Sequence, residues 1–191
     1  VLAKEGLIRR THGGAEFIGN ESDNKIPFTV RALEDYNAKI AMAQKAAALV
    51  KDDFVIMLDG SSSAYNVIPF LKDKKNLTVI TNGVKAIDLL EKTDIKTICT
   101  GGYLLPLLKT LVGQDAIDLL DKYNADIAFF SCRGLTEDGK ATDFSIEENA
   151  VRQKMIKQSR IKVLLCAKKK FGKKYVHNLC DVKTIDYCIS E

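Results

Sequence analysis

Residues 54–63 read FVIMLDGSSS, an unbroken apolar run that ends in an aspartate, a glycine and three serines. A continuous apolar run is typical of a strand in a parallel sheet, where both faces are covered by helices. The change to small polar residues marks the end of the strand, and serine is favoured at the start of a helix. The stretch therefore predicts a strand at residues 54–58, a loop, and a helix at residues 62–71.

The same alternation of apolar runs and helical stretches continues along the chain. We predict further strands at residues 77–80, 96–99, 127–130, 162–165 and 184–189, and helices at residues 31–50, 84–92, 114–123 and 146–159. Strands that alternate with helices build βαβ units around a parallel sheet. The predicted fold class is therefore α/β, with a Rossmann-like, mostly parallel sheet flanked by helices.

The segment before the α/β pattern has a different character. Residues 6–15 combine apolar and basic residues and run into a glycine turn, as expected of a short strand. Residues 16–28 contain Gly, Asn, Ser, Asp and Pro with little periodicity, which is typical of a linker. We predict a short appendage at residues 1–15, a linker at residues 16–28 and an α/β domain at residues 29–191.

The composition narrows the class of protein. Hydrophobic residues make up 46% and charged residues 28%, which indicates a globular domain rather than a disordered chain. No apolar run approaches the roughly 20 residues that span a bilayer, and no signal peptide is evident, so we expect a cytoplasmic protein without membrane contact. The five cysteines form no C-x-x-C pair, so we expect neither a disulfide framework nor a metal site, and no cofactor. A net charge of +4 is too small to indicate nucleic-acid binding by the whole chain.

The loop after the first strand is a candidate phosphate site. It contains Asp59, Gly60, Ser61, Ser62 and Ser63. A helix N-terminus offers free backbone N–H groups, glycine allows close approach of the backbone, and hydroxyls add donors without negative charge. The alternative is that a serine only caps the helix while the aspartate ends the strand.

Other strand ends carry similar chemistry. The later candidates are Thr81, Asn82, Gly101, Gly102, Asp143, Glu148 and Lys170. Ligands of open α/β sheets bind beyond the carboxyl ends of the strands, so polar residues at several strand ends are expected to converge on one crevice. There the carboxylates are suited to sugar hydroxyls and the lysine to a phosphate, although each residue alone is as compatible with a turn or a surface position.

An ordered series of motifs resembles the DeoR-type bacterial transcriptional repressors. The motifs are Arg10-x-x-Gly13-Gly14-Ala15, Pro27-Phe28 with Arg31, Leu58-Asp59 with its serines, Thr81-Asn82, Gly101-Gly102, Gly139 with Thr142-Asp143, Glu148 with Val151-Arg152, and Lys170-Phe171-Gly172. No single motif is specific, but their order and spacing are, and they cover nearly the whole chain.

The resemblance implies a function and a set of site residues. It implies a sensor domain with the fold shared by ribose-5-phosphate isomerase and CoA transferases, which binds a phosphorylated sugar and controls operator binding by an N-terminal winged helix-turn-helix domain. Residues 1–15 would then be a remnant of that domain, with its recognition helix missing from this chain. Palindromic operators further imply a homo-oligomer. In this interpretation the twelve candidates at the strand ends bind the effector.

Two positions depart from the family pattern. The family loop has its glycine two places after the aspartate, whereas here Gly60 follows Asp59 directly. Ala167 stands where the family has an aspartate, in the segment that leads to Lys170. The second change replaces a hydrogen-bond acceptor with a methyl group, so the identity of the effector stays open.

Two enzyme classes of the same fold are the alternatives. A phosphosugar isomerase needs a carboxylate base and a lysine, for which Glu148, Asp143 and Lys170 are candidates. The opening arginine-glycine motif has no evident use in such an enzyme. A CoA transferase needs a glutamate nucleophile at a strand end, and no matching glutamate follows the apolar runs. We therefore favour the sensor over either enzyme.

Overall fold

A computed structural model describes residues 8–11, 14–17 and 26–191 of the chain. Its centre is a sheet of six strands in the order β13-β11-β8-β3-β4-β5, in which all neighbours are parallel. The strands are β3 (Val55–Leu58), β4 (Thr78–Thr81), β5 (Lys96–Cys99), β8 (Ala125–Ser131), β11 (Ser159–Leu165) and β13 (Tyr187–Ile189). Every strand predicted from the sequence is present, although β13 begins three residues later than predicted. The predicted parallel α/β fold class is confirmed.

The strand order places a topological switch point at the centre of the sheet. The chain runs outward from β3 through β4 to β5, and then returns to β8 on the opposite side of β3. Connections on the two sides of such a point lead to opposite faces of the sheet, so they leave a crevice at the carboxyl ends of β3 and β8. Leu58 and Phe129 are paired across these two strands just before the crevice.

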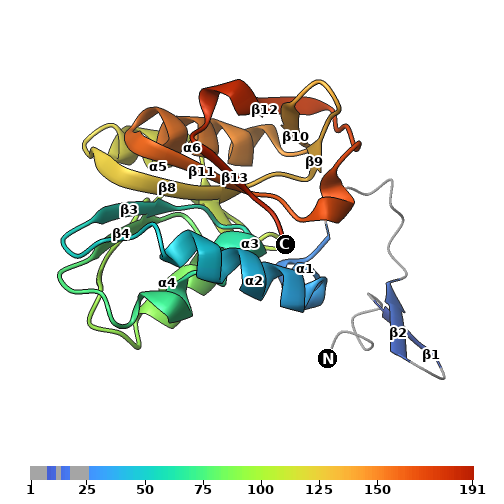
Figure 1. Ribbon diagram of the computed structural model, residues 1–191, viewed down its shortest axis with the longest axis horizontal. Coiled ribbons are helices and arrows are strands. Elements are labelled where there is room, and N and C mark those ends of the chain that lie inside the picture. The colour runs from blue at the N-terminus through green and yellow to red at the C-terminus, as the bar shows by residue number, and fades with distance from the viewer. Residues whose placement is uncertain (1–7, 12–13, 18–25) are drawn as a thin grey trace.

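Helices cover both faces of the sheet (Figure 1). One face packs against α2 (Tyr36–Ala47), α4 (Val84–Leu90) and the 3-10 helix η2 (Ile68–Leu71), and the other packs against α5 (Gln114–Leu120) and α6 (Ile146–Lys157). Alternate residues of β3 enter the two cores, since Ile56 and Leu58 face the first and Met57 faces the second. All three are fully buried, which explains the unbroken apolar run in the sequence.

Two predicted helices are interrupted. The predicted helix at residues 31–50 is divided into α1 (Phe28–Leu33) and α2, because Asp35 adopts a left-handed conformation with φ of 46°. The buried amine of Lys39 donates hydrogen bonds to the carbonyls of Arg31 and Glu34, which end α1. The predicted helix at residues 62–71 is divided into α3 (Ser62–Tyr65) and η2. Both interruptions lie where the chain passes the carboxyl edge of the sheet.

Short strands outside the main sheet were not predicted. A hairpin of β6 (Tyr103–Leu105) and β7 (Thr110–Val112) follows β5. A small antiparallel sheet contains β9 (Gly134–Leu135), β10 (Lys140–Asp143) and β12 (His177–Asp181). Two further 3-10 turns, η3 (Lys168–Lys170) and η4 (Val182–Thr184), precede β12 and β13 respectively. The strands of the hairpin and of the small sheet have two to five residues, which is too few to show the alternation of apolar and polar residues that marks a strand in a sequence.

The segment before the α/β body contains a second hairpin. β1 (Ile8–Thr11) pairs antiparallel with β2 (Gly14–Phe17), so strand structure extends into the predicted linker at residues 16–28. Residues 1–7, 12–13 and 18–25 lie outside the described residues, and with them most of the predicted remnant and linker. None of the helices that the structure describes is long and apolar enough to span a membrane.

Candidate functional site

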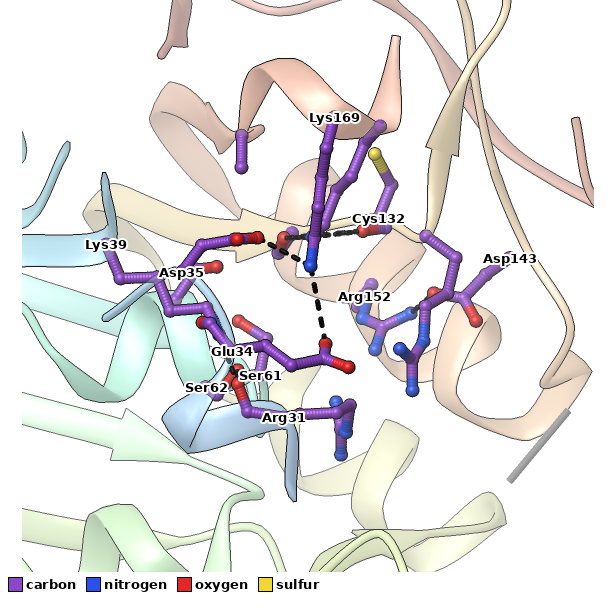
Figure 2. Close-up of a pocket in the computed structure, with 15 residues that line it drawn as sticks. Arg31, Glu34, Asp35, Lys39, Ser61, Ser62, Cys132, Asp143, Arg152 and Lys169 are labelled. Carbon is purple, nitrogen blue, oxygen red and sulfur yellow. Dashed lines mark hydrogen bonds and ion pairs between the residues drawn. The ribbon is translucent and has the colours of Figure 1, made fainter. Parts of the chain in front are cut away.

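A polar pocket lies at the carboxyl edge of the sheet, where the switch point was expected to place it (Figure 2). It is bounded by α1 and α2, the loop after β3, the turn after β8, the end of β10, α6, and η3 after β11. The lining residues are Arg31, Glu34, Asp35, Lys39, Ser61, Ser62, Ser63, Ser131, Cys132, Arg133, Asp143, Arg152, Ala167, Lys169 and Lys170. Six of these fifteen are cations, so the pocket is suited to an anionic ligand.

Asp59 ties the two strands of the switch point together from behind the pocket. Its Oδ1 accepts a hydrogen bond of 3.0 Å from the Ser61 N–H, and its Oδ2 accepts one of 3.2 Å from the Ser131 N–H. The side chain is 1% exposed and also accepts a hydrogen bond from Arg152. Asp59 therefore holds the loop in position rather than lining the pocket itself.

Arg152 collects three carboxylates in a buried cluster. Its guanidinium nitrogens lie 2.9 Å from Asp59, 2.8 Å from Asp143 and 3.4 Å from Glu148. The contacts with Asp59 and Asp143 are hydrogen bonds, whereas Glu148 Oε1 is buried without a hydrogen-bond partner. Burial acts to lower the pKa of Arg152, but the three carboxylates outweigh it and raise this pKa above its ordinary value. The cluster is thus an arginine held charged inside the protein, with excess negative charge around it.

The serine loop combines capping with free donors. Ser61 caps α3 by accepting a hydrogen bond of 3.1 Å from the Ala64 N–H, as the capping alternative predicted. The next two backbone N–H groups, of Ser62 and Ser63, have no acceptor inside the helix because they belong to its first turn. The Ser62 hydroxyl donates to the Arg31 carbonyl at 3.3 Å. Since α3 has only four residues, an anion here would be held by these donors rather than by a helix dipole.

Two lysines are aimed into the pocket beside this loop. Lys170 Nζ donates to Ser131 Oγ at 2.9 Å and to the Cys132 carbonyl at 2.6 Å, so one of its three N–H bonds is left for a ligand. Burial lowers the pKa of Lys170. Burial lowers the pKa of Lys39 to about 8, and the charge of Lys170 is the next cause. An anion placed between the two amines would relieve both effects.

Lys169 bridges the pocket mouth to the break between α1 and α2. Its Nζ lies 2.6 Å from Asp35 Oδ2 and 3.6 Å from Glu34 Oε2 (Figure 2). Burial acts to lower the pKa of Lys169, but the two carboxylates outweigh it and raise this pKa. The left-handed residue Asp35 thus positions both carboxylates against η3, on the far side of the pocket.

The structure brings together part of the predicted site. Ser61, Ser62, Ser63, Asp143 and Lys170 line the pocket. Asp59 and Glu148 lie directly behind it on Arg152. These seven residues come from four separate parts of the chain, which meet because β3, β8 and β11 are neighbours in the sheet.

The remaining predicted residues lie away from the pocket lining. Thr81 Oγ1 accepts a hydrogen bond from the N–H of Gly83, the N-cap residue of α4, and Asn82 Nδ2 donates to the carbonyl of Leu111 in β7. Gly101 and Gly102 are exposed, with φ of 70° and 93°. They follow β5 at the edge of the sheet, two strands from the switch point, which is too far to reach the pocket.

Gly60 has a packing role that differs from the predicted one. A Cβ atom at this position would lie 2.1 Å from Thr110 Cγ2 and 3.3 Å from the Gly83 Cα. The glycine therefore allows the loop to pack against the exit of β4 and against β7. This contact accounts for a glycine at position 60 without any ligand.

Sequence reasoning gave no site role to several residues that line the pocket. Among them are Arg31, Lys39, Arg133, Arg152 and Lys169. The spacing of Glu148 and Arg152 is a usable signal, since residues four apart lie on one face of a helix. Isolated basic residues elsewhere carry no comparable signal, because most of them are solvent-exposed.

The described residues hold no cluster of three metal-binding side chains. Cys132 and Cys166 are adjacent buried thiols with their sulfurs 3.9 Å apart, at the ends of β8 and β11. These two cysteines are free, as are the other three.

Comparison with known proteins places the chain among bacterial regulators. A family model described as the DeoR C terminal sensor domain matches residues 34–191. The HTH-type transcriptional regulator GolR of Listeria innocua is 32% identical over the whole chain and 75% of its own length. The L-fucose operon activator of Haemophilus influenzae is 32% identical over the whole chain and 76% of its length. The glycerol-3-phosphate regulon repressor of Escherichia coli is 25% identical over 97% of the chain and 73% of its length.

Solved structures with the same fold include enzymes and translation factors. Ribose 5-phosphate isomerase A of Methanocaldococcus jannaschii has a TM-score of 0.54 and 20% identity over 72% of the chain and 55% of its own. The delta subunit of eIF2B from Chaetomium thermophilum has a TM-score of 0.60 and 16% identity over 82% of the chain and 57% of its own. The chain thus spans little more than half of each. At these identities the likeness shows the fold alone, and it confirms the predicted resemblance to the isomerase fold.

Proposed function

The chain belongs to the family that carries the DeoR C-terminal sensor domain, and from this premise we propose that its pocket binds a phosphorylated sugar and thereby controls transcription. Two of the relatives named above are an activator of an L-fucose operon and a repressor of a glycerol-3-phosphate regulon. In this proposal the whole regulator acts in the cytoplasm, where a helix-turn-helix domain contacts operator DNA and the pocket reports the metabolite.

The observation that carries the proposal is the division of charge around the pocket. Lys39 is buried and Lys170 is half-buried, and both have lowered pKa values beside the free N–H groups of Ser62 and Ser63. We place the phosphate of the effector there, where it would restore the charge that burial disfavours. The carboxylates on Arg152 lie nearby, where Asp143 is positioned to accept hydrogen bonds from sugar hydroxyls.

The same geometry favours a sensor over an isomerase. An isomerase needs a carboxylate that is free to take a proton from a substrate carbon. Asp59, Asp143 and Glu148 are buried and each lies within ion-pair distance of Arg152, so none of the three is free in this sense. We therefore expect the bound sugar phosphate to remain unchanged.

A calorimetric titration with sugar phosphates tests the proposal. The panel is glycerol phosphate and the monophosphates of pentoses, hexoses and ketoses, with the matching free sugars as controls. At least one phosphate should bind while its free sugar does not. The Lys170→Ala variant should bind that phosphate at least about tenfold more weakly, because removing a charged partner in a desolvated site costs about 2–5 kcal/mol.

Lys168→Ala is the matched control, since Lys168 is an exposed lysine of the same 3-10 turn. It should bind like the wild type. Equal affinity of the Lys170→Ala variant would mean that the phosphate lies elsewhere, and failure of the whole panel to bind would refute the sensor proposal. Conversion of the ligand during the titration would instead indicate an enzyme.

We also propose a homo-oligomer, because a two-fold symmetric regulator reads a palindromic operator. Analytical ultracentrifugation of the full regulator tests this, and a monomer at high concentration would contradict it.

A further inference from the structure

The carboxylates near the pocket are concentrated on two of its six cations. Three of them surround Arg152, and two contact Lys169. The other four cations of the lining form no ion pair with any carboxylate of the described residues: Arg31, Lys39, Arg133 and Lys170. Their charges are therefore available to a bound anion.

These four cations line one pocket, with an arginine pair, Arg31 and Arg133, and a lysine pair, Lys39 and Lys170; the charge of Arg133 also lowers the pKa of Lys170. Burial lowers the pKa of Arg31 to about 10, and the charge of Arg133 is the next cause. In the same way, the charge of Lys170 is the next cause after burial of the lowered pKa of Lys39. Each pair holds two like charges close together in a partly desolvated space. The lysine pair belongs to the phosphate position proposed above, whereas the arginine pair has no assigned ligand.

The two arginines are held in place by aromatic rings. Arg31 Cζ lies 5.6 Å from the ring centre of Phe28, and Arg133 Cζ lies 5.0 Å from that of Phe144. A guanidinium stacked on a ring keeps its N–H bonds in a plane that points past the ring, where they can bind a planar or tetrahedral anion in a bidentate manner. Figure 2 shows Arg31 extending along the pocket toward the end that contains Arg152 and Asp143.

Each of these guanidiniums has a buried nitrogen without a partner. Arg31 Nη2 donates to the Leu108 carbonyl at 3.2 Å, but its Nε has no acceptor. Arg133 Nη2 also has none. Arg31 is only 6% exposed, so a donor without an acceptor is costly at this position. A water molecule would satisfy a hydrogen bond here, but only an anion would also compensate the two charges.

We infer that Arg31 and Arg133 bind a second anionic group, so that the effector is a sugar phosphate that also carries a second phosphate or a carboxylate. This inference rests on the proposed function, because it takes the lysine pair and serine loop as the site of the first phosphate. The sugar then spans the pocket between the two cation pairs, and its hydroxyls face the carboxylates on Arg152.

The test uses ligand pairs that differ only in the second anionic group. The first pair is fructose monophosphate and fructose bisphosphate, and the second is glucitol phosphate and phosphogluconate, which are both open chains. In the wild type, the doubly anionic member of at least one pair should bind about tenfold more tightly or better, which corresponds to about 1.4 kcal/mol. Preference for the bisphosphate identifies a second phosphate, and preference for phosphogluconate identifies a carboxylate.

Arg133→Gln should weaken binding of the doubly anionic ligand far more than binding of the monophosphate, and so remove this preference. Arg133→Lys should restore part of it, since it keeps the charge but loses the bidentate fork. Arg160→Gln is a matched control, because Arg160 also stacks on an aromatic ring: its Cζ lies 5.9 Å from the ring centre of Phe54. Unlike Arg133, Arg160 is largely exposed and forms an ion pair with Asp126. This control should retain the full preference. Thermal unfolding of each variant shows whether it is folded.

Three results separate the two proposals. Equal affinity for both members of each pair, or an undiminished preference in Arg133→Gln, would overturn the second anionic group while the sensor proposal stands. Binding of none of the ligands, monophosphates included, would refute the sensor proposal and this inference with it. Loss of the preference in Arg133→Gln, in a folded variant that still binds the monophosphate measurably, would support the arginine pair as the second anion site.

Discussion

Replacing Arg152 by methionine should destabilise the protein more than any other single change in the pocket. The guanidinium is 3% exposed, and three carboxylates of similar burial depend on it for compensation. Breaking a buried ion pair by removing one partner costs about 3–5 kcal/mol, and here three partners lose their cation. For a domain of this size that corresponds to a decrease in melting temperature of roughly 6–20 °C.

Urea unfolding followed by circular dichroism measures this free energy directly. Arg160→Met is the control, since Arg160 forms an exposed ion pair and its removal should cost less than about 1 kcal/mol. Adding Asp143→Asn to Arg152→Met should cost less than Asp143→Asn costs alone, because the two side chains are in contact and their effects are coupled.

The free energy of unfolding of Arg152→Met shows whether Arg152 compensates the three buried carboxylates. A free energy of unfolding within about 1 kcal/mol of the wild type would mean that the carboxylates are compensated in some other way. Additive effects of the two substitutions would show that Arg152 and Asp143 are not energetically coupled. Either result would refute the account of the cluster given above.

Two further predictions follow from the pocket walls. Gly60→Ala should lower the free energy of unfolding in urea by about 1–3 kcal/mol, because the new methyl group would overlap Thr110 Cγ2. Adding Thr110→Ser should recover part of this loss. A Gly60→Ala variant with the stability of the wild type would contradict the close packing. An anion bound beside Lys39 should raise its pKa from about 8 toward the ordinary 10.5, so calorimetry between these pH values should show proton uptake on binding, and none well below pH 8, where the amine is already charged. The uptake should disappear in Lys39→Met, and its absence in the wild type would remove Lys39 from the phosphate site.

The sequence by itself determined the parallel sheet. Residues of β3 such as Ile56, Met57 and Leu58 are buried alternately in two cores, so burial on both faces is written into a continuous apolar run. The helix break at Asp35 was not predicted, since residues 31–50 contain no glycine or proline that would mark it. The break depends on contacts of Lys39 and Lys169 with residues 31–35, which a local pattern does not contain.

The site was predictable only where its residues lie at the ends of central strands. The serine loop and Lys170 meet because β3 and β11 both flank β8, whereas Gly101 and Gly102 follow the edge strand β5. A sequence shows that a strand ends in polar residues, but it does not show which strand ends are neighbours. That depends on the strand order.

Tertiary structure alone decided the charge arrangement of the pocket. Asp59 and Arg152 are 93 positions apart, and the same pocket is lined by Arg31 of α1 and by Arg133 after β8. Hydrophobic periodicity is a local property, so it can be read along the chain. The pairing of charges depends on distance and burial in three dimensions, and only the folded sheet determines which arginine is compensated and which is left for a ligand.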